Sequence, residues 1–266
     1  MTNGSPLAAQ DQIAEVDGWP INVATEADAI AKILDAAERG ESFAAFTLNL
    51  DHLVKLRADA AFRDAYRAAR FVTADGAPVA KLASQPGRRV LRTTGADLVI
   101  PLAAGAAQRN LGIALYGSTP DVLSRAGRSL SEASGGALHI THAVSPPYGF
   151  DPESAVADAA LDDIAASGAR LCFVALGAPK QEILAARAVK KGVPVGFVCI
   201  GAALDFLAGA QQRAPAFMRN NGLEWFWRFA TNPRRLGWRY IQCGQVLSSI
   251  VVRRSLARLC GQEGVS

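Results

Sequence analysis

Residues 71–78 have the sequence FVTADGAP, in which a short apolar run is followed by two helix-breaking residues. Residues 71–73 are typical of a buried strand, whereas Gly76 breaks it and Pro78 is predicted to begin a helix. Asp75 then lies at the carboxyl end of a strand, where open α/β sheets bind their ligands. The alternative is that Asp75 is only a helix N-cap, which stabilises a helix by roughly 1 kcal/mol.

The rest of the chain alternates apolar strands with helices. Strands are predicted at 19–24, 43–48, 71–73, 112–117, 138–144, 170–177 and 193–201, and helices at 25–39, 50–57, 62–69, 78–84, 92–109, 120–133, 153–167 and 179–191. Continuous apolar strands separated by helices are typical of parallel sheets that are buried on both faces. We therefore expect an α/β fold with Rossmann-like parallel sheets covered by helices, followed by a basic helical appendage.

The 266 residues, half of them apolar, suit one large or two small α/β domains. We expect a disordered lead-in, an α/β body that could divide into two Rossmann-like halves, and a C-terminal appendage. The predicted bounds are 1–18 for the lead-in, 19–209 for the body, with halves of about 19–110 and 111–209, and 210–266 for the appendage.

Targeting and redox signals are sparse. No apolar run reaches the roughly 20 residues that a membrane span needs, and residues 1–10 lack the basic start and apolar core of a signal peptide. The four cysteines show no CxxC spacing, which indicates buried thiols in a reducing cytoplasm. The expected location is cytoplasmic.

Arginines concentrate near the end of the chain. Between Trp225 and Cys260 there are seven arginines and no Asp or Glu, and without those seven the formal net charge of +4 becomes −3. Such a segment predicts an anionic partner. Its interleaved aromatic residues favour contact with a membrane surface over nucleic acid, and solvated arginine is the simpler alternative. Three of these arginines share a helix face if the region is helical, although Pro233 is predicted to break it: Arg228, Arg235 and Arg239.

Residues 176–182, with the sequence LGAPKQE, form the sharpest local motif. A buried strand ends at Gly177, and a helix begins with Pro179 in its first turn. The N–H groups at a helix N-terminus suit a phosphate or sugar oxygen. Lys180 adds positive charge and Gln181 can both donate and accept hydrogen bonds. The alternative is an ordinary turn between strand and helix.

Several common motifs are absent from the sequence. It contains no GxGxxG dinucleotide fingerprint, no phosphate-binding GxxxxGK[ST] loop, no GxSxG elbow and no DxD pair for a metal-bound diphosphate. If a nucleotide diphosphate binds, arginines and helix N-termini must therefore neutralise its charge.

Taken together, the motifs resemble those of the WecG/TagA/CpsF family of bacterial glycosyltransferases. The resemblance runs in order over residues 20–242 and rests on Thr47-x-Asn49, Ala74-Asp75-Gly76, Arg92-x-x-Gly95-x-Asp97-Leu98, Gly177-x-Pro179-Lys180-Gln181-Glu182, Gly201-x-x-x-Asp205-Phe206-x-x-Gly209, Arg213-Ala214-Pro215, Gly222-Leu223-Glu224-Trp225, Arg228 and Pro233-x-Arg235-x-x-x-Arg239-Tyr240. The sequence departs from the family at Ala202-Ala203-Leu204, where glycines are usual, and at the Leu50-Asp51 pair that follows Asn49.

The resemblance implies roles for individual residues. Asp75 would be the general base that takes a proton from the acceptor hydroxyl. The sugar and acceptor pocket would be lined by Thr47, Asn49, Arg92 and Gln181, and Asp205 would help to hold the nucleotide. The arginines at 228, 235 and 239 would close over the diphosphate and stabilise the leaving UDP.

The resemblance also implies the substrates: a UDP-sugar donor and a saccharide linked to a polyprenyl diphosphate, with inversion, no metal and no cofactor. Such an enzyme would work in exopolysaccharide or envelope-glycan synthesis, peripherally on the inner face of the cell membrane. Residues 19–209 would be its catalytic body, and residues 210–266 would be an appendage that associates with membranes and completes the active site. A non-catalytic membrane-associated nucleotide-binding module is the alternative function, and the missing glycine fingerprint disfavours a nicotinamide-dependent enzyme. The donor sugar and the choice between monomer and homo-oligomer stay open.

Overall fold

The computed structural model describes residues 14–220, 222–231 and 233–262. Its strands are β1 (Ala14–Val16), β2 (Trp19–Ile21), β3 (Phe43–Leu48), β4 (Phe71–Ala74), β5 (Gly112–Gly117), β6 (Ile140–Val144), β7 (Ala169–Ala175) and β8 (Gly196–Cys199). Its helices are α1 (Glu26–Glu38), α2 (Leu50–Ala58), α3 (Ala60–Arg67), α4 (Ala77–Ala83), α5 (Gly95–Gln108), α6 (Pro120–Ala133), α7 (Ala155–Ala166), α8 (Lys180–Lys191), α9 (Ala203–Leu207), α10 (Ala216–Asn220), α11 (Glu224–Thr231) and α12 (Pro233–Gln262).

Strands β3 to β8 form one parallel sheet in the order β4-β3-β8-β7-β5-β6. The predicted fold class, a Rossmann-like parallel sheet covered by helices, is confirmed. The sheet contains strands from both sides of residue 110, so residues 19–110 and 111–209 share it. All the strands point the same way, and their carboxyl ends therefore meet along one edge of the sheet.

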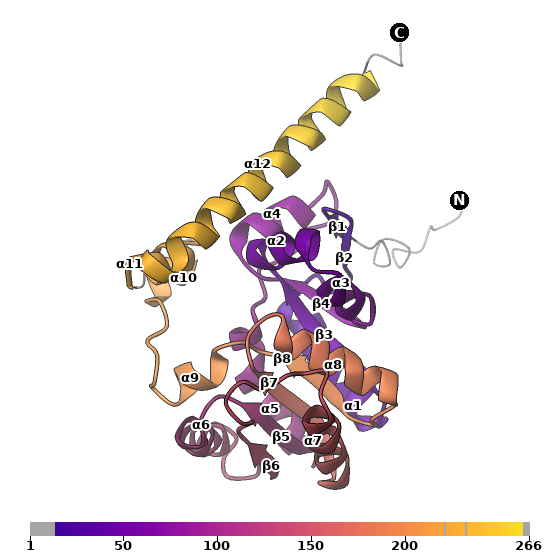
Figure 1. Ribbon diagram of the computed structural model, residues 1–266, viewed down its shortest axis with the longest axis vertical. Helices are drawn as coiled ribbons and strands as arrows, with labels where there is room; N and C mark the ends of the chain where they lie inside the picture. The colour runs from indigo at the N-terminus through magenta and orange to yellow at the C-terminus, as the bar shows by residue number, and fades with distance from the viewer. Residues whose placement is uncertain (1–13, 221, 232, 263–266) are drawn as a thin grey trace, which may run out of the picture.

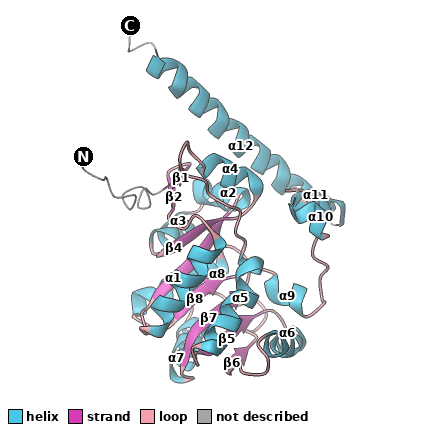
Figure 2. Ribbon diagram, turned by 180° about the vertical axis from the view of Figure 1, so that it is seen from behind, coloured by secondary structure: helices cyan, strands magenta, loops and turns pink. Residues whose placement is uncertain are grey.

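Helices cover both faces of the sheet, as the two opposite views in Figures 1 and 2 show. The core on one face includes side chains from α2, α3, α7 and α8, and the core on the other face includes side chains from α1, α5 and α6. Strand β3 contributes to both cores, because Ala44, Phe46 and Leu48 face one side while Phe43 and Ala45 face the other. Burial on both faces explains why the strand is continuously apolar.

The strand predicted at 19–24 ends at Ile21, and two other predicted strands end too late, each at a glycine. The strands predicted at 170–177 and 193–201 end at Ala175 and Cys199 instead. Gly177 and Gly201 have φ angles of 72° and 58°, which no strand contains. The chain therefore leaves the ladder before each glycine and forms a loop at the carboxyl edge of the sheet.

The prediction of a disordered lead-in is wrong at the C-terminal end of its range, where the chain forms a hairpin. Residues Ala14–Val16 form a strand that pairs antiparallel with β2, with Ala14 opposite Ile21, whereas residues 1–18 were expected to be disordered. Asp17 and Gly18 form the two-residue turn with φ angles of 56° and 83°. An Asp-Gly pair between apolar residues is a strong hairpin signal, and the hairpin accounts for the difference. Residues 1–13 lie outside the described part of the chain.

The C-terminal segment consists of α10, α11 and α12. The helix break predicted at Pro233 is confirmed, because α12 begins there. Helix α12 packs on α2 and then projects beyond the body (Figure 1). Its buried side chains, Leu236, Cys243, Val246 and Ile250, recur at helical spacing. Within the described residues, no helix combines the length and apolar character that crossing a membrane requires.

Candidate functional site

Asp75 and Asn49 lie side by side at the carboxyl edge of the sheet. Parallel pairing places Leu48 beside Ala74, so the next residue of each strand, Asn49 and Asp75, leaves the sheet at the same level. The Asp75 backbone N–H donates to the Leu48 carbonyl at 2.8 Å, and Asn49 Nδ2 donates to Asp75 Oδ2 at 3.2 Å. The predicted carboxylate thus occupies the edge at which α/β sheets bind ligands.

Asp75 is not the N-cap of the helix that follows it. Helix α4 begins at Ala77, and its N-cap residue is Gly76, with φ 91° and no side-chain cap hydrogen bond. This φ lies in the region that favours glycine, so the chain turns sharply after Asp75. The capping alternative weighed from the sequence is therefore wrong, and the Asp75 carboxylate instead faces Asn49.

Asn49 has two roles, which together fix the orientation of its amide. It is the N-cap of α2, because its Oδ1 accepts from the His52 backbone N–H at 2.9 Å. Since the oxygen is committed to the helix, the amide NH2 must face Asp75. The neighbouring Thr47 lies on β3 with 8% of its surface exposed, beside Thr73 of β4.

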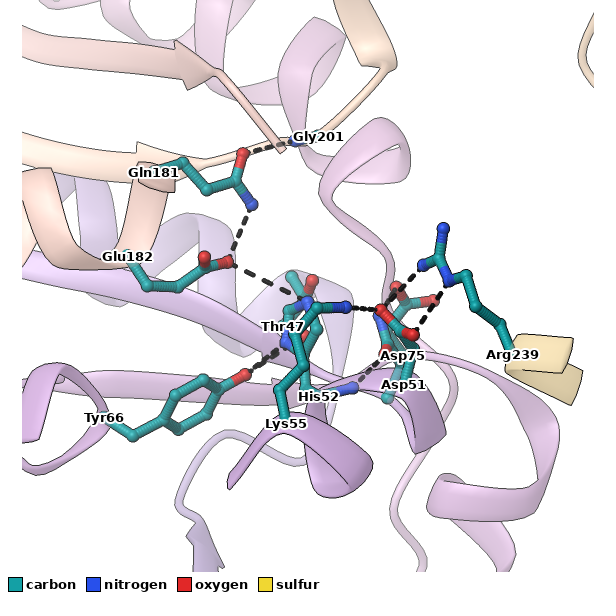
Figure 3. A network of polar contacts seen from close by, with 11 residues as sticks. Thr47, Asp51, His52, Lys55, Tyr66, Asp75, Gln181, Glu182, Gly201 and Arg239 are labelled. Atoms are coloured by element: carbon teal, nitrogen blue, oxygen red, sulfur yellow. Dashed lines mark hydrogen bonds and ion pairs between the residues drawn. The ribbon is translucent and has the colours of Figure 1, made fainter. Parts of the chain in front are cut away.

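A chain of buried polar groups runs from α3 to the loop after β8 (Figure 3). His52 Nδ1 lies 2.6 Å from Tyr66 Oη, and His52 Nε2 lies 3.9 Å from Glu182 Oε1. Gln181 Nε2 donates to Glu182 Oε1 at 2.7 Å, and the Gly201 backbone N–H donates to Gln181 Oε1 at 3.1 Å. These contacts tie α2, α3, α8 and the β8 loop together.

Burial sets the charge states of His52 and Glu182. Burial lowers the pKa of His52 to about 3, so its imidazole is neutral at physiological pH. Burial also raises the pKa of Glu182 to about 7, against hydrogen bonds from Gln181 and from its own backbone N–H. The contact between His52 and Glu182 is therefore not a pair of full opposite charges. Glu182 Oε2 has no hydrogen-bond partner among the described residues.

The LGAPKQE motif divides between surface and interior. Gly177 is exposed, and a Cβ atom added to it would meet open space. Pro179 is the N-cap residue of α8, and Lys180 Nζ donates to the Phe150 carbonyl at 2.7 Å. Gln181 is only 4% exposed, and its amide already has protein partners on both sides. Its expected contact with substrate stays a prediction.

Asp205 lies near a different strand from Asp75. It belongs to α9, and its Oδ1 accepts from Ser118 Oγ at 3.1 Å. Ser118 follows β5 with φ 54°, directly after Gly117, where an added Cβ would lie 2.4 Å from the Ala175 carbonyl oxygen. The close approach of β5 to β7 thus requires glycine. Ser118 belongs to this part of the site, and no motif in the sequence indicated it.

Arg92 connects the body to the C-terminal segment. It forms an isolated parallel bridge with Ala74, so it lies next to the strand that leads to Asp75. Its Nη2 lies 3.6 Å from Asp97 Oδ2, and its Nη1 lies 3.5 Å from Glu224 Oε2 on α11. Arg213 forms a second ion pair with Asp97. The pair of Arg92 with Glu224 joins α11 to the body, and the pair of Arg213 with Asp97 holds the stretch that leads into α10.

Arg239 reaches the same corner from α12. Its Nε and Nη2 donate to the two carboxylate oxygens of Asp51, at 2.9 and 2.7 Å, in a bidentate pair. Burial raises the pKa of Asp51, but hydrogen bonds from Arg239 and Lys55 outweigh burial and lower it. Asp51 lies in the first turn of α2, two residues after Asn49, and Figure 3 shows its ion pair with Arg239.

Of the three predicted diphosphate arginines, the structure describes one side chain. The side chains of Arg228 on α11 and Arg235 on α12 lie outside the described residues. Asp51, His52 and Glu182 are parts of the site that sequence reasoning did not select. A lone histidine at this position carries no metal or catalytic spacing, and Glu182 was noted only as part of a motif.

The site thus combines a carboxylate at a sheet edge with an arginine from a distant segment. The sequence model of the glycosyl transferase WecG/TagA/CpsF family matches residues 14–259. The chain belongs to this family of glycosyltransferases, whose substrates are a sugar donor and an acceptor.

Proposed function

We propose that the protein transfers a hexose or N-acetylhexosamine-type sugar from a UDP-sugar to a polyprenyl-diphosphate-linked saccharide, with inversion and without a metal. The observation that carries this proposal is the convergence of Asp75, Asn49 and Arg239 at one corner of the sheet. The first two come from neighbouring strand ends, and the third comes from the C-terminal segment.

The chemistry follows from these positions. The Asp75 carboxylate accepts the proton of the acceptor hydroxyl while that oxygen forms a bond to C1 of the donor sugar. The bond between C1 and the diphosphate oxygen breaks, and its electron pair leaves with UDP. Guanidinium groups of Arg239, Arg228 and Arg235 stabilise the charge that develops on the diphosphate. Attack on the face opposite the leaving group inverts C1.

The hydrogen bond from Asn49 supports Asp75 as the base. Asp75 Oδ2 accepts from Asn49, and this contact restricts the rotation of the carboxylate that we assign to the acceptor hydroxyl. A base held in one orientation removes a proton more effectively than one that rotates freely. Arg92, beside the same strand, is assigned to the sugar and acceptor pocket together with Thr47.

The second end of the proposed donor site is the loop region of β5, β7 and β8. We assign Asp205, Gly177 and the start of α8, with Pro179 and Lys180, to binding of the nucleotide sugar. The open surface at Gly177 and the hydroxyl partner of Asp205 support this assignment. Both lie on the carboxyl edge that also carries Asp75.

A membrane surface is the proposed location of the acceptor. Helix α12 carries exposed apolar side chains alongside exposed arginines: Trp238, Ile241, Val251, Val252 and Leu256, with Arg239 and Arg253. Such a face suits the boundary between lipid headgroups and acyl chains, on the cytoplasmic side of the cell membrane. Replacing Val251, Val252 and Leu256 by serine should reduce co-sedimentation with anionic vesicles. A Val156→Ser variant in the body, exposed to a similar degree, is the matched control.

The experiment that tests the reaction is a panel of UDP-sugars assayed with lipid-linked monosaccharides, with UDP release as the readout. We expect turnover with at least one donor, a product of inverted anomeric configuration by NMR, and unchanged rates in EDTA. Nucleotide binding without turnover on any acceptor would favour the non-catalytic module. Retention of configuration would refute the proposed role of Asp75.

A further inference from the structure

The polar chain through Glu182 and His52 has no part in the reaction as proposed above, although it is buried in the body. Glu182 is 0% exposed and His52 is 5% exposed. Buried carboxyl groups are rare unless they have a partner or a function. Glu182 Oε2 has no hydrogen-bond partner among the described residues, which makes this carboxyl costly to retain for packing alone.

Polar contacts depend on direction and distance, so they restrict how the groups that make them are oriented. Breaking one of them leaves a buried polar group unpaired, which is unfavourable. Tyr66 Oη lies within hydrogen-bond distance of His52 Nδ1, at 2.6 Å, and Glu182 Oε1 lies on the other side of the ring, 3.9 Å from Nε2. The ring in turn fixes the first turn of α2 relative to α8 and to the loop at Gly201.

The first turn of α2 is also where Asn49 is attached. The His52 backbone N–H donates to Asn49 Oδ1, and Asn49 Nδ2 donates to Asp75 Oδ2. A displacement of His52 would therefore move or rotate the Asn49 amide and break its hydrogen bond to the Asp75 carboxylate. Hydrogen bonds and the 3.9 Å approach of Glu182 to His52 thus connect Gly201 with Asp75, across the ends of β8, β3 and β4.

We propose that Glu182 and His52 are positioning residues, which hold Asn49 in the orientation that fixes Asp75 for proton removal. The proposal rests on the function proposed above, because it needs Asp75 to be the base. Neither residue contacts substrate or the reacting atoms. A neutral imidazole suits this role, since it makes directed contacts without placing a full charge in the core.

A double-mutant cycle tests whether Glu182 acts through Asn49. Glu182→Met keeps the length of the side chain and removes its polar atoms, and we expect it to lower kcat about 10-fold with little change in the KM for the donor. In an Asn49→Ala background the same change should cost less than about 2-fold, because the contact that it supports is already lost. Glu182→Gln, which keeps the oxygen that accepts from Gln181, should retain most of the activity.

If Glu182→Met fails to fold, a pair of tyrosine variants tests the same series of polar contacts. Tyr66→Phe removes one hydroxyl group from the chain, and we expect kcat to fall severalfold. Tyr116→Phe removes a hydroxyl group from an equally buried tyrosine on β5 and should leave kcat unchanged. Equal effects of the two changes, or a full 10-fold loss from Glu182→Met in the Asn49→Ala background, would overturn the proposal.

A readout without turnover separates this proposal from the proposed reaction. The side-chain amide of Asn49 gives its own NMR signals, and its protons should exchange faster with solvent in Tyr66→Phe than in Tyr116→Phe. Unchanged exchange would refute the positioning role even in an active enzyme. If exchange increases while Asp75→Asn retains activity, the positioning contact exists but the proposed function of Asp75 fails.

Discussion

The body and the C-terminal segment hold their polar groups in different ways. In the body, Asn49, His52 and Glu182 are linked through contacts that are largely shielded from solvent. The C-terminal segment is held partly by ion pairs at the surface, such as Arg239 with Asp51 and Arg253 with Asp17, whose arginine side chains are 47% and 61% exposed. Ion pairs whose arginines are open to solvent in this way are screened by salt more than buried contacts are.

This difference indicates that the body and the segment serve different steps of the reaction. A buried network holds one geometry, which suits the group that removes the proton. A segment attached partly by exposed pairs can move away and return, which suits groups that must admit a nucleotide sugar and release UDP. The apolar contacts of Val246 and Ile250 keep α12 on the body. Point substitutions therefore test the segment better than its removal, which would expose that core.

The largest loss of turnover is expected in the body, at Asp75. Asp75→Asn removes the base but keeps the shape of the side chain, and turnover should fall by at least about 100-fold. UDP affinity by calorimetry and the thermal midpoint should stay close to those of the unchanged protein. Asp64→Asn, an exposed carboxylate on α3, is the matched control and should retain full turnover.

Between pH 5 and 7, the free energy of unfolding should change with pH because of the buried network. The surface ion pairs should not contribute to that change. Burial raises the pKa of Glu182 to about 7 from its ordinary 4.5, so between these values the folded protein holds a proton that the unfolded chain has released. Raising the pH through this window therefore favours unfolding. Burial lowers the pKa of His52 to about 3, and this shift acts in the opposite direction from pH 3 to 6.5.

Glu182→Gln separates these two contributions. The variant keeps the effect of His52 and loses that of Glu182, with Lys55 and Asp51 acting on both proteins alike. From pH 5 to 7, its free energy of unfolding should rise relative to that of the unchanged protein by about 2 kcal/mol. Urea titrations at the two pH values measure the difference. A constant difference would show that Glu182 titrates normally.

The next effect concerns Arg239. Arg239→Ala should lower turnover about 10-fold, because a charge that stabilises the leaving diphosphate is lost. Asp51→Asn breaks the same ion pair but keeps the guanidinium, so its effect should be smaller. Equal losses in the two variants would assign Arg239 to docking alone. Arg253→Ala, which breaks another pair between segment and body, should change turnover less than about 2-fold.

The smallest effect is expected from salt. Between about 0.05 and 0.5 M salt, hydrogen exchange of α11 and the first turns of α12 should increase modestly, because exposed ion pairs are screened. Exchange of β3, β4 and α2 backbone amides should stay constant. An equal increase in both regions would contradict the division between a fixed body and a movable segment.

The body was more predictable from the sequence than the segment. Strands β3 and β5 and helix α6 have the predicted bounds, because apolar runs between glycines and prolines specify them locally. Asp75 could also be placed, since a strand and a helix start frame it. The Asp17-Gly18 hairpin was missed because the strands on either side of it are only three residues long.

Contacts between distant residues could not be predicted in this way. Nothing in the spacing of His52, Tyr66 and Glu182 indicates that they meet, because their proximity depends on how α2, α3 and α8 pack on the sheet. The same holds for Arg239 and Asp51, which are 188 residues apart. The resemblance to the family supplied the expectation that the segment joins the site, but it did not indicate which carboxylate Arg239 would contact.

The central claim is that Asp75 of the body and arginines of the segment act on one bound donor. The most direct measurement is a crystal structure of the Asp75→Asn variant with an unhydrolysed UDP-sugar. We predict that C1 of the sugar faces residue 75 and that the Arg239 guanidinium contacts the diphosphate. A donor bound away from the β3 and β4 ends, with residue 75 facing no part of the sugar, would contradict the account.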